Sequence, residues 1–384
     1  MRTAIVTGDY YKHQETFINR HIECLFGGNT CVITARYNQE NPFAKPVYTR
    51  RSQPSLKKLI TSPLPLLMNR LKYGTMRIPH GKARSDLKAF LRDQKVELIL
   101  SEFGTQVLPI RPLAKELGLP IFTYFRGVDA SKALRRTATV KAYRSCIPKL
   151  DGVIAVSQFL LDNLAEHGIR NDNSHVIPSG VNVRRFMPRE KTPKSCVAVG
   201  RMVEKKAPLT TIRAFAIVAK HHPEARLTII GDGPLLSAAR ALVRDLGIQD
   251  RVELPGKGTH DQVRAALENS EVFLQHSVTA KDGNTEGLPT AIQEAMACGC
   301  VIVSTRHAGI PEAVFNGKNG FLADERDEVG YTENLNTVLE SDSRKEMGHN
   351  SRLMAEEHYD NNALLGETEK ILQSLVARKK GQIE

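Results

Sequence analysis

The sequence predicts an α/β protein with two doubly wound, Rossmann-like domains, each built on a parallel sheet. Short apolar runs alternate with helical patterns along most of the chain, which is the order that strands joined by crossover helices require. The chain has 384 residues, more than one hydrophobic core usually serves. A charged stretch with a proline, residues 184–194, separates two such series and is the predicted linker.

The first domain is expected over residues 1–183. The apolar run at its start is too short for a signal-peptide core and fits a buried strand, Thr3–Thr7. Further apolar runs predict the remaining strands at 30–35, 96–101, 120–125, 152–156 and 174–177.

The second domain is expected over residues 195–360. Its apolar runs predict strands at 196–199, 226–230, 252–254, 272–275 and 301–304. Helical patterns between them predict helices near 208–221, 234–246, 260–268, 289–298 and 310–316. The polar and apolar periodicity from about Thr332 to Ala377 predicts helices that pack back across both domains or cap the second. The C-terminal helix is expected over residues 361–384.

Composition indicates a globular protein, with 41% hydrophobic and 25% charged residues and no repeat at solenoid spacing. The six cysteines form no CxxC pair and no metal-finger spacing, so we expect reduced, structural thiols. Proline, glycine or charge interrupts every apolar stretch before the roughly 20 residues that a membrane-spanning helix needs.

The net charge of +12 is concentrated between residues 45 and 95, where thirteen lysines and arginines face only two aspartates. Apolar residues interleave with these cations, as in the run from Leu64 to Leu71. Basic and apolar residues at this density predict a surface that lies on an anionic membrane. A solvated face and a nucleic-acid patch are the alternatives. No recognised nucleic-acid module accompanies the segment, so we expect no nucleic-acid partner.

A carboxylate stands on each side of a predicted helix start. Glu286 precedes Gly287, Leu288 and Pro289, and Glu294 lies two turns further on. Proline suits the first helical turn, glycine allows close approach to the backbone, and the free amides of that turn suit a diphosphate. The two carboxylates suit sugar and ribose hydroxyls. Alternatively, they are an ordinary helix-start acid and a solvated helix residue.

Two permanent cations follow the first strand of the second domain. Arg201 comes directly after Gly200, and Lys206 lies on the same loop, so the two could clamp a diphosphate. Gly231 and Gly233 follow the next strand at a tight turn. Ligands of doubly wound sheets bind at the carboxyl ends of the strands, where all these residues fall. An exposed basic loop is the alternative interpretation of Arg201 and Lys206.

The ordered set of Gly200-Arg201 with Lys206, Gly231-Asp232-Gly233-Pro234, and Glu286 through Glu294 resembles the family-four retaining glycosyltransferases. The resemblance covers essentially the whole second domain. The segment from His276 to Pro289 resembles the subgroup that builds exopolysaccharides such as colanic acid, as does Glu15-Thr16-Phe17-Ile18 in the first domain.

This resemblance implies the GT-B fold, in which the two domains face each other across a cleft. It implies Glu286, Arg201 and Lys206 as catalytic residues and Glu294 as the ribose ligand. The donor site would also include backbone at Gly200, Gly231, Gly233, Gly287 and Leu288. The acceptor or phosphate side would include Gly8, Glu15, Arg126 and Asp129.

Two positions depart from the family pattern, Gln14 where serine is usual and Arg126, and the second affects the chemistry. The family commonly has His-Gly-x-Asp where this chain has Arg126-Gly127-Val128-Asp129. Arginine is always charged and cannot act as a base, which puts a proton-transfer role for this position in doubt. Arg126 could instead bind a phosphate, or form a salt bridge with Asp129.

The resemblance further implies front-face transfer, in which the leaving diphosphate helps to remove the acceptor proton. Such a reaction depends on positioning and electrostatics. We therefore expect a nucleotide-sugar donor, with a UDP-sugar favoured, and a lipid-linked or saccharide acceptor. We expect no cofactor and no required metal, and a cytoplasmic protein peripheral to the inner face of the cell membrane. A sugar-nucleotide epimerase and a catalytically inactive binding protein of the polysaccharide machinery are the alternatives.

Overall fold

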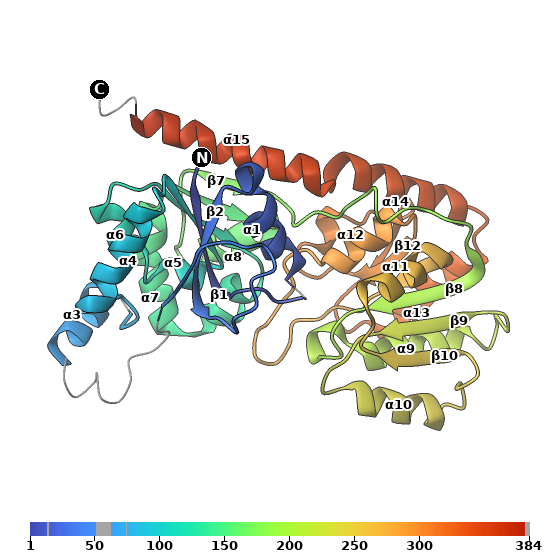
Figure 1. Cartoon of the computed structure of the whole chain (residues 1–384). Coiled ribbons are helices and arrows are strands. Elements are labelled where there is room, and N and C mark those ends of the chain that lie inside the picture. Colours follow the sequence, from blue (N-terminus) through green and yellow to red (C-terminus); the bar gives the residue numbers. More distant parts are fainter. Residues whose placement is uncertain (14, 51–62, 74, 381–384) are drawn as a thin grey trace. The chain divides into compact units, whose positions relative to one another are not determined.

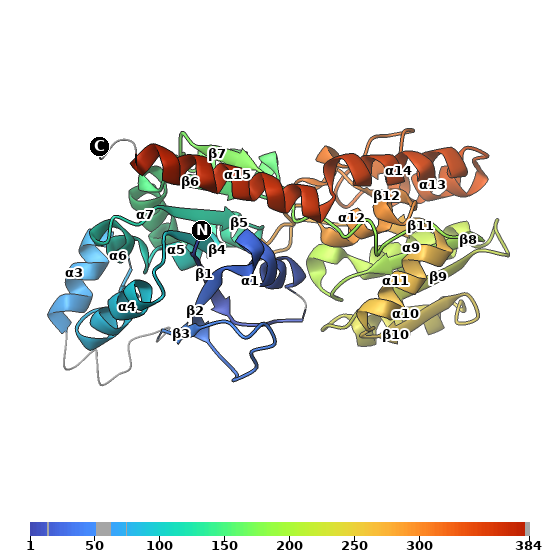
Figure 2. The same ribbon diagram turned by 45° about the horizontal axis from the view of Figure 1, so that its top comes forward.

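The computed structural model describes residues 1–13, 15–50, 63–73 and 75–380. The chain forms two compact units. The first unit is Met1–Ile177 with Leu365–Glu384, and the second unit is Pro178–Leu364. Helices cover both faces of the sheet in each unit (Figures 1 and 2). The predicted class, α/β with two Rossmann-like domains, is confirmed.

The sheet of the first unit is parallel throughout the described residues, with the order β3-β2-β1-β4-β5-β6-β7. Its strands are β1 Thr3–Asp9, β2 Thr30–Arg36, β3 Val47–Thr49, β4 Leu98–Glu102, β5 Ile121–Phe125, β6 Gly152–Ala155 and β7 Ser174–Val176. The order reverses between β1 and β4, so the carboxyl ends of these two neighbours form the switch point of this sheet.

The helices of the first unit follow its strands along the chain. They are α1 Thr16–Gly28, α3 Pro63–Tyr73, α4 Lys82–Asp93, α5 Gly104–Val107, α6 Arg111–Glu116, α7 Thr137–Cys146 and α8 Gln158–Glu166, with 3₁₀ turns η1 Val128–Ala130, η2 Lys132–Arg135 and η3 Ile147–Lys149. The last helix, α15 Asn361–Lys380, belongs to this unit from Leu365 onward. There Glu369 accepts a hydrogen bond from the backbone N–H of Phe26 at 2.5 Å.

The sheet of the second unit is likewise parallel, with the order β10-β9-β8-β11-β12-β13. Its strands are β8 Thr192–Val199, β9 Arg226–Ile230, β10 Val252–Gly256, β11 Ser270–Leu274, β12 Val301–Thr305 and β13 Gly320–Ala323. The helices are α9 Pro208–Val218, α10 Leu236–Asp245, α11 His260–Asn269, α12 Thr290–Ala297, α13 Glu328–Glu340 and α14 Arg344–His358, with 3₁₀ turns η4 Glu204–Lys206 and η5 Ile310–Glu312.

Alternate residues of one central strand pack into two different cores. Val272 and Leu274 of β11 join a core with side chains of α9, α10 and α13, whereas Phe273 joins a core with α12 and α14. Successive side chains of a strand point to opposite faces, and both faces of a parallel sheet are covered by helices. This is why the strand sequences are continuous apolar runs.

Several elements differ from the sequence prediction. The short strands β3 and β13 were not expected, and the stretch assigned to a linker overlaps the start of β8 at Thr192. The helix expected over 310–316 is a single 3₁₀ turn, η5, with Pro311 in its first positions. Proline lacks the N–H that would extend a helix from an earlier turn.

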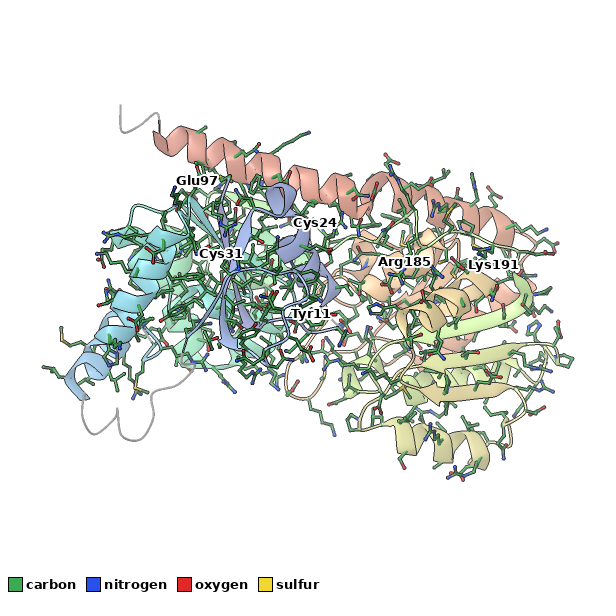
Figure 3. The ribbon with its side chains drawn as sticks, viewed as in Figure 1. Tyr11, Cys24, Cys31, Glu97, Arg185 and Lys191 are labelled. Atoms are coloured by element: carbon green, nitrogen blue, oxygen red, sulfur yellow. The ribbon has the colours of Figure 1, made fainter. Side chains whose placement is uncertain are left out.

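The six cysteines are all free, and five of them are buried. Cys31 lies on β2 and the partly exposed Cys24 lies on α1 (Figure 3). Burial raises the pKa of the Cys31 thiol to about 12. A thiol with so high a pKa is a poor nucleophile, which agrees with a structural role.

Within the described residues, no helix has the length and apolar character needed to cross a membrane. The basic segment 45–95 includes α3, α4 and β3. Part of it, with Lys57 and Lys58, lies outside the described residues.

Candidate active site

The predicted donor residues gather at the carboxyl ends of neighbouring strands in the second unit. Gly200 and Lys206 follow β8, Gly231 follows β9, and Glu286 lies on the long loop after β11. The strand order reverses between β8 and β11, so the loops after these two strands lie on either side of the switch point. A doubly wound sheet binds its ligands at this place.

The glycines of the β9 turn allow its backbone to touch the β8 loop. A Cβ on Gly231 would come within 1.8 Å of the Gly200 carbonyl oxygen, and one on Gly233 within 2.6 Å of the Met202 carbonyl oxygen. Gly233 also has a φ of +153°, which side chains disfavour. The Met202 N–H donates to the Asp232 carbonyl at 2.9 Å and joins the two turns.

Glu286 is held between two lysines. Its Oε1 lies 3.1 Å from Lys206 Nζ, and its Oε2 lies 3.2 Å from Lys205 Nζ. Lys206 Nζ also donates to Gln275 Oε1 at 3.0 Å, and Lys205 Nζ to the Thr285 carbonyl at 3.2 Å. Loops after two adjacent strands therefore meet through one buried carboxylate.

Burial and charge act in opposite directions on these groups. Burial alone would raise the pKa of Glu286, but Lys206 and Lys205 outweigh it and lower that pKa to about 2. Burial also lowers the pKa of Lys206, against the opposing effect of Glu286. The carboxylate is thus ionised at neutral pH, although the residue is only 8% exposed.

A pocket opens beside this cluster. Gly200, Arg201, Lys206 and Gln275 contribute its polar wall, and Pro208 lies on its apolar side. Arg201 is exposed, so its guanidinium can reach a ligand without leaving a buried partner. Both residues predicted to bind the diphosphate, Arg201 and Lys206, therefore line the same pocket.

The start of α12 contributes backbone donors. Pro289 is the N-cap residue of α12, whereas the sequence predicted it as the first helical residue. In the part of the chain that the structure describes, the N–H groups of Gly287 and Leu288 donate to no protein acceptor. Amides near a helix start suit an anion.

Glu294 lies about one turn into α12 and is partly buried. Burial raises its pKa to about 7, although the charges of Arg185 and Lys206 oppose that rise. Arg185, labelled in Figure 3, lies on the segment before β8. The carboxyl group is therefore close to its titration midpoint at neutral pH.

His307 and Glu325 support the Glu286 loop and were not singled out from the sequence. The Glu286 N–H donates to His307 Nε2 at 3.0 Å, and His307 Nδ1 lies 2.5 Å from Glu325 Oε1. Glu325 also accepts from the Thr279 N–H at 2.7 Å. His307 follows β12 and Glu325 follows β13.

In the first unit, Arg126 belongs to a buried charged cluster. Its Nε donates to Glu102 Oε2 at 2.8 Å, and His21 Nδ1 lies 2.6 Å from Glu102 Oε1. The guanidinium lies over the rings of Phe17 and Tyr124, 4.2 and 3.8 Å from their centroids. Burial raises the pKa of Glu102, but Arg126 and His21 outweigh it, so the net shift is downward.

Asp129 binds backbone donors. It accepts the N–H of Gly104 at 2.7 Å and those of Arg126 and Gly127 at 3.1 Å each. Burial nevertheless raises the pKa of this carboxyl group. The sequence suggested a salt bridge between Arg126 and Asp129, but the carboxylate next to the guanidinium is Glu102.

Gly8 and Glu15 lie near the other side of the switch point in this unit. Gly8 is the next-to-last residue of β1, and Glu15 is the N-cap position of α1, where Lys12 Nζ donates to it at 3.2 Å. Lys12 Nζ also lies 2.7 Å from Asp9. The four predicted acceptor-side residues thus fall at the β1, β4 and β5 end of one sheet.

Two family models match the chain. The model described as Glycosyltransferase Family 4 matches residues 31–185, and that described as Glycosyl transferases group 1 matches residues 182–354. A putative colanic acid biosynthesis glycosyltransferase, WcaL of Escherichia coli, is 30% identical over 73% of this chain and 71% of its own length.

Two further proteins are similar. The amylovoran biosynthesis glycosyltransferase AmsK of Erwinia amylovora is 30% identical over 53% of this chain, which spans about half (51%) of AmsK. The crystal structure of Anabaena Alr3699/HepE in complex with UDP superimposes with a TM-score of 0.75, covering 97% of this chain and 100% of its own, at 18% identity.

Fold, glycine turns and the lysine–carboxylate cluster together define a protein with two Rossmann-like domains and a charged pocket at the carboxyl ends of its second sheet. The match to WcaL shows to which family of such two-domain proteins the chain belongs. The chain belongs to the family-four glycosyltransferases of the GT-B fold, in the subgroup of the colanic acid enzymes.

Proposed function

We propose that this protein transfers a hexose, with retention of configuration, from a nucleotide sugar to a lipid-linked or saccharide acceptor during exopolysaccharide synthesis. The observation that carries the proposal is the buried Glu286 carboxylate, paired with Lys205 and Lys206 beside the pocket. The names of WcaL and AmsK support the exopolysaccharide setting. Alr3699/HepE has been crystallised with UDP and with UDP-glucose, which favours a UDP-sugar donor.

The residues take distinct roles in this proposal. Arg201 and Lys206 bind the diphosphate, together with the amides of Gly287 and Leu288. Glu286 accepts hydrogen bonds from hydroxyls of the transferred sugar, and Glu294 binds the ribose. Gly200, Gly231 and Gly233 let the two turns beside the donor site pack closely against each other.

The proposed chemistry uses one face of the sugar. The bond between the anomeric carbon and the diphosphate oxygen breaks, while the acceptor oxygen bonds to the same carbon from the same side. The acceptor proton passes to the departing diphosphate oxygen. Negative charge grows on the diphosphate as the bond breaks, so Arg201 and Lys206 stabilise the transition state more than the ground state.

For the acceptor side we propose the β1, β4 and β5 end of the first unit, with Gly8, Glu15, Arg126 and Asp129. The Glu102 carboxylate and two aromatic rings hold the Arg126 side chain in place. A fixed arginine suits recognition of a phosphate or carboxylate on the acceptor.

The structure also supports the proposed contact with an anionic membrane. The apolar side chains of Leu64, Leu67, Met68 and Leu71 on α3 are 65%, 53%, 58% and 74% exposed. Residues at this i, i+3, i+4, i+7 spacing share one helical face, and Arg70 beside them is also exposed. Apolar face and cation together suit the boundary between headgroups and acyl chains. We place the protein on the cytoplasmic face of the cell membrane.

The proposal is tested by incubating pure protein with UDP- and GDP-sugars, with and without a lipid extract. We expect release of the nucleoside diphosphate that depends on the lipid fraction. Conversion of the nucleotide sugar without any acceptor would support an epimerase instead. Neither reaction, together with retained binding to the extract, would support an inactive binding protein.

A further inference from the structure

We infer that His307 and Glu325 are positioning residues that hold the Glu286 loop in the geometry that sugar transfer requires. This inference rests on the proposed function of Glu286. The loop follows β11, and the two side chains reach it from the next two strands of the sheet, since His307 follows β12 and Glu325 follows β13.

The hydrogen bonds determine how His307 is protonated. Its Nε2 accepts the Glu286 N–H at 3.0 Å, so Nε2 carries no proton and the ring proton resides on Nδ1. That Nδ1–H points to Glu325 Oε1 at 2.5 Å. A neutral imidazole therefore connects a carboxylate to one particular backbone amide, and its orientation is set by both partners.

Glu325 is itself held in place. It accepts the Thr279 N–H at 2.7 Å and the Thr279 hydroxyl at 3.1 Å. Burial raises the pKa of Glu325, but the hydrogen bonds from His307 and Thr279 outweigh it and lower that pKa to about 2. Thr279 lies in the first half of the loop between β11 and α12 and Glu286 lies in its second half, so Glu325 and His307 fasten this loop at two points.

The contact lies next to the groups that meet the donor. The His307 side chain is fully buried. The N–H group that donates to it belongs to Glu286, the proposed catalytic residue. The next two residues, Gly287 and Leu288, carry the amides proposed for the diphosphate. The Gly309 N–H donates to the Gly287 carbonyl at 2.9 Å and joins the same two loops. A shift of about 1 Å in a reacting group can lower a rate about 100-fold.

Two substitutions at one position separate this role from general packing. In His307→Asn the amide nitrogen can still reach Glu325, but no acceptor remains for the Glu286 N–H. In His307→Gln the longer side chain can place its oxygen near the former Nε2 position. We expect His307→Asn to lower kcat at least about tenfold with little change in UDP affinity, and His307→Gln to recover most of that loss.

The measurements are kcat and donor KM for nucleotide release with lipid extract, UDP affinity by titration, and thermal melting. His221→Asn, at an exposed histidine of the same unit, is the control and should match the parent. Should His307→Asn fail to fold, Thr279→Val removes only the 3.1 Å hydroxyl bond to Glu325 and should lower kcat a few-fold.

The outcomes distinguish this inference from the proposed function. An inactive parent protein with every donor would reject the proposed transfer. An active parent with an equally active, folded His307→Asn variant would overturn the positioning role alone. Equal kcat losses in the Asn and Gln variants would overturn the hydrogen bond to the Glu286 amide as its cause.

Discussion

At Glu286 the protein keeps a carboxylate ionised in a place where burial favours the neutral form. Lys205 and Lys206 supply the compensating charge at 3.2 and 3.1 Å. A negative group flanked by two cations can accept hydrogen bonds from sugar hydroxyls while the cations remain available to phosphate. Such an arrangement at a pocket, with shifted pKa values, is typical of a functional site.

The pKa of Glu294 is raised, whereas that of Glu286 is lowered, and this predicts that the stability of the protein depends on pH. Its pKa is raised from 4.5 to about 7, so the folded protein favours the protonated form. Below about pH 4.5 this group therefore makes its full contribution to the free energy of unfolding. That contribution, roughly 3 kcal/mol, is lost as the pH rises through 7. Glu294→Gln mimics the protonated form at all pH values and should not show this loss.

The check is the thermal midpoint of parent and Glu294→Gln without ligand from pH 5 to pH 8. The variant should gain stability relative to the parent as pH rises. A constant difference between the two proteins across this range would contradict the shifted pKa.

Among the elements, the β9 turn shows how backbone contact holds the β8 loop, whose residues Gly200 and Met202 line the pocket. Gly231→Ala would place a methyl group where the Gly200 carbonyl oxygen now lies, 1.8 Å from the ideal Cβ. One of the two loops must move, so we expect the thermal midpoint to fall by at least about 5 °C and UDP binding to weaken.

Gly366→Ala is the matched control for this substitution. Gly366 lies within α15, and a Cβ there meets nothing within 4 Å. Alanine is preferred over glycine in a helix by about 1 kcal/mol, so the control should melt at the parent temperature or above it. A Gly231→Ala protein that melts and binds UDP like the parent would refute the close contact.

The exposed face of α3 makes a separate prediction about membranes. Leu67→Ser with Leu71→Ser should weaken sedimentation with phosphatidylserine-containing vesicles at least about tenfold, because each buried leucine contributes about 1.5 kcal/mol. Arg70→Gln should weaken binding by about 1 kcal/mol, mainly at low salt.

Val329→Ser tests whether any exposed apolar side chain has this effect. Val329 is 70% exposed but lies on α13 of the second unit. It should sediment like the parent. If the double α3 variant also sediments like the parent, the membrane role of this face is wrong.

For the whole molecule, strand prediction succeeded where burial on both faces leaves a long apolar run, as in β1, β2 and β9. It failed for β3 and β13, which have three and four residues and depend on a neighbouring strand for their pairing. Segments this short carry little periodicity, and of the described strands with three or four residues only β6 and β7 were predicted.

The site was predicted in part. The sequence indicated Arg201, Lys206 and Glu286 as members of one site, and the structure pairs the last two directly. The roles of His307, Glu325 and Glu102 could not be predicted, because their partners lie 18 or more residues away and meet them only through the order of the strands. Motif spacing describes single loops and does not show which loops touch.

The most direct test of the account compares nucleotide release by the parent and by Glu286→Gln at saturating donor with lipid extract. Glu286 is proposed to act on the sugar, so we expect UDP affinity to stay within a few-fold and kcat to fall by about 100-fold or more. Glu253→Gln, an exposed position in the same unit, should behave as the parent. Unchanged kcat in the folded Glu286→Gln protein would contradict the central claim.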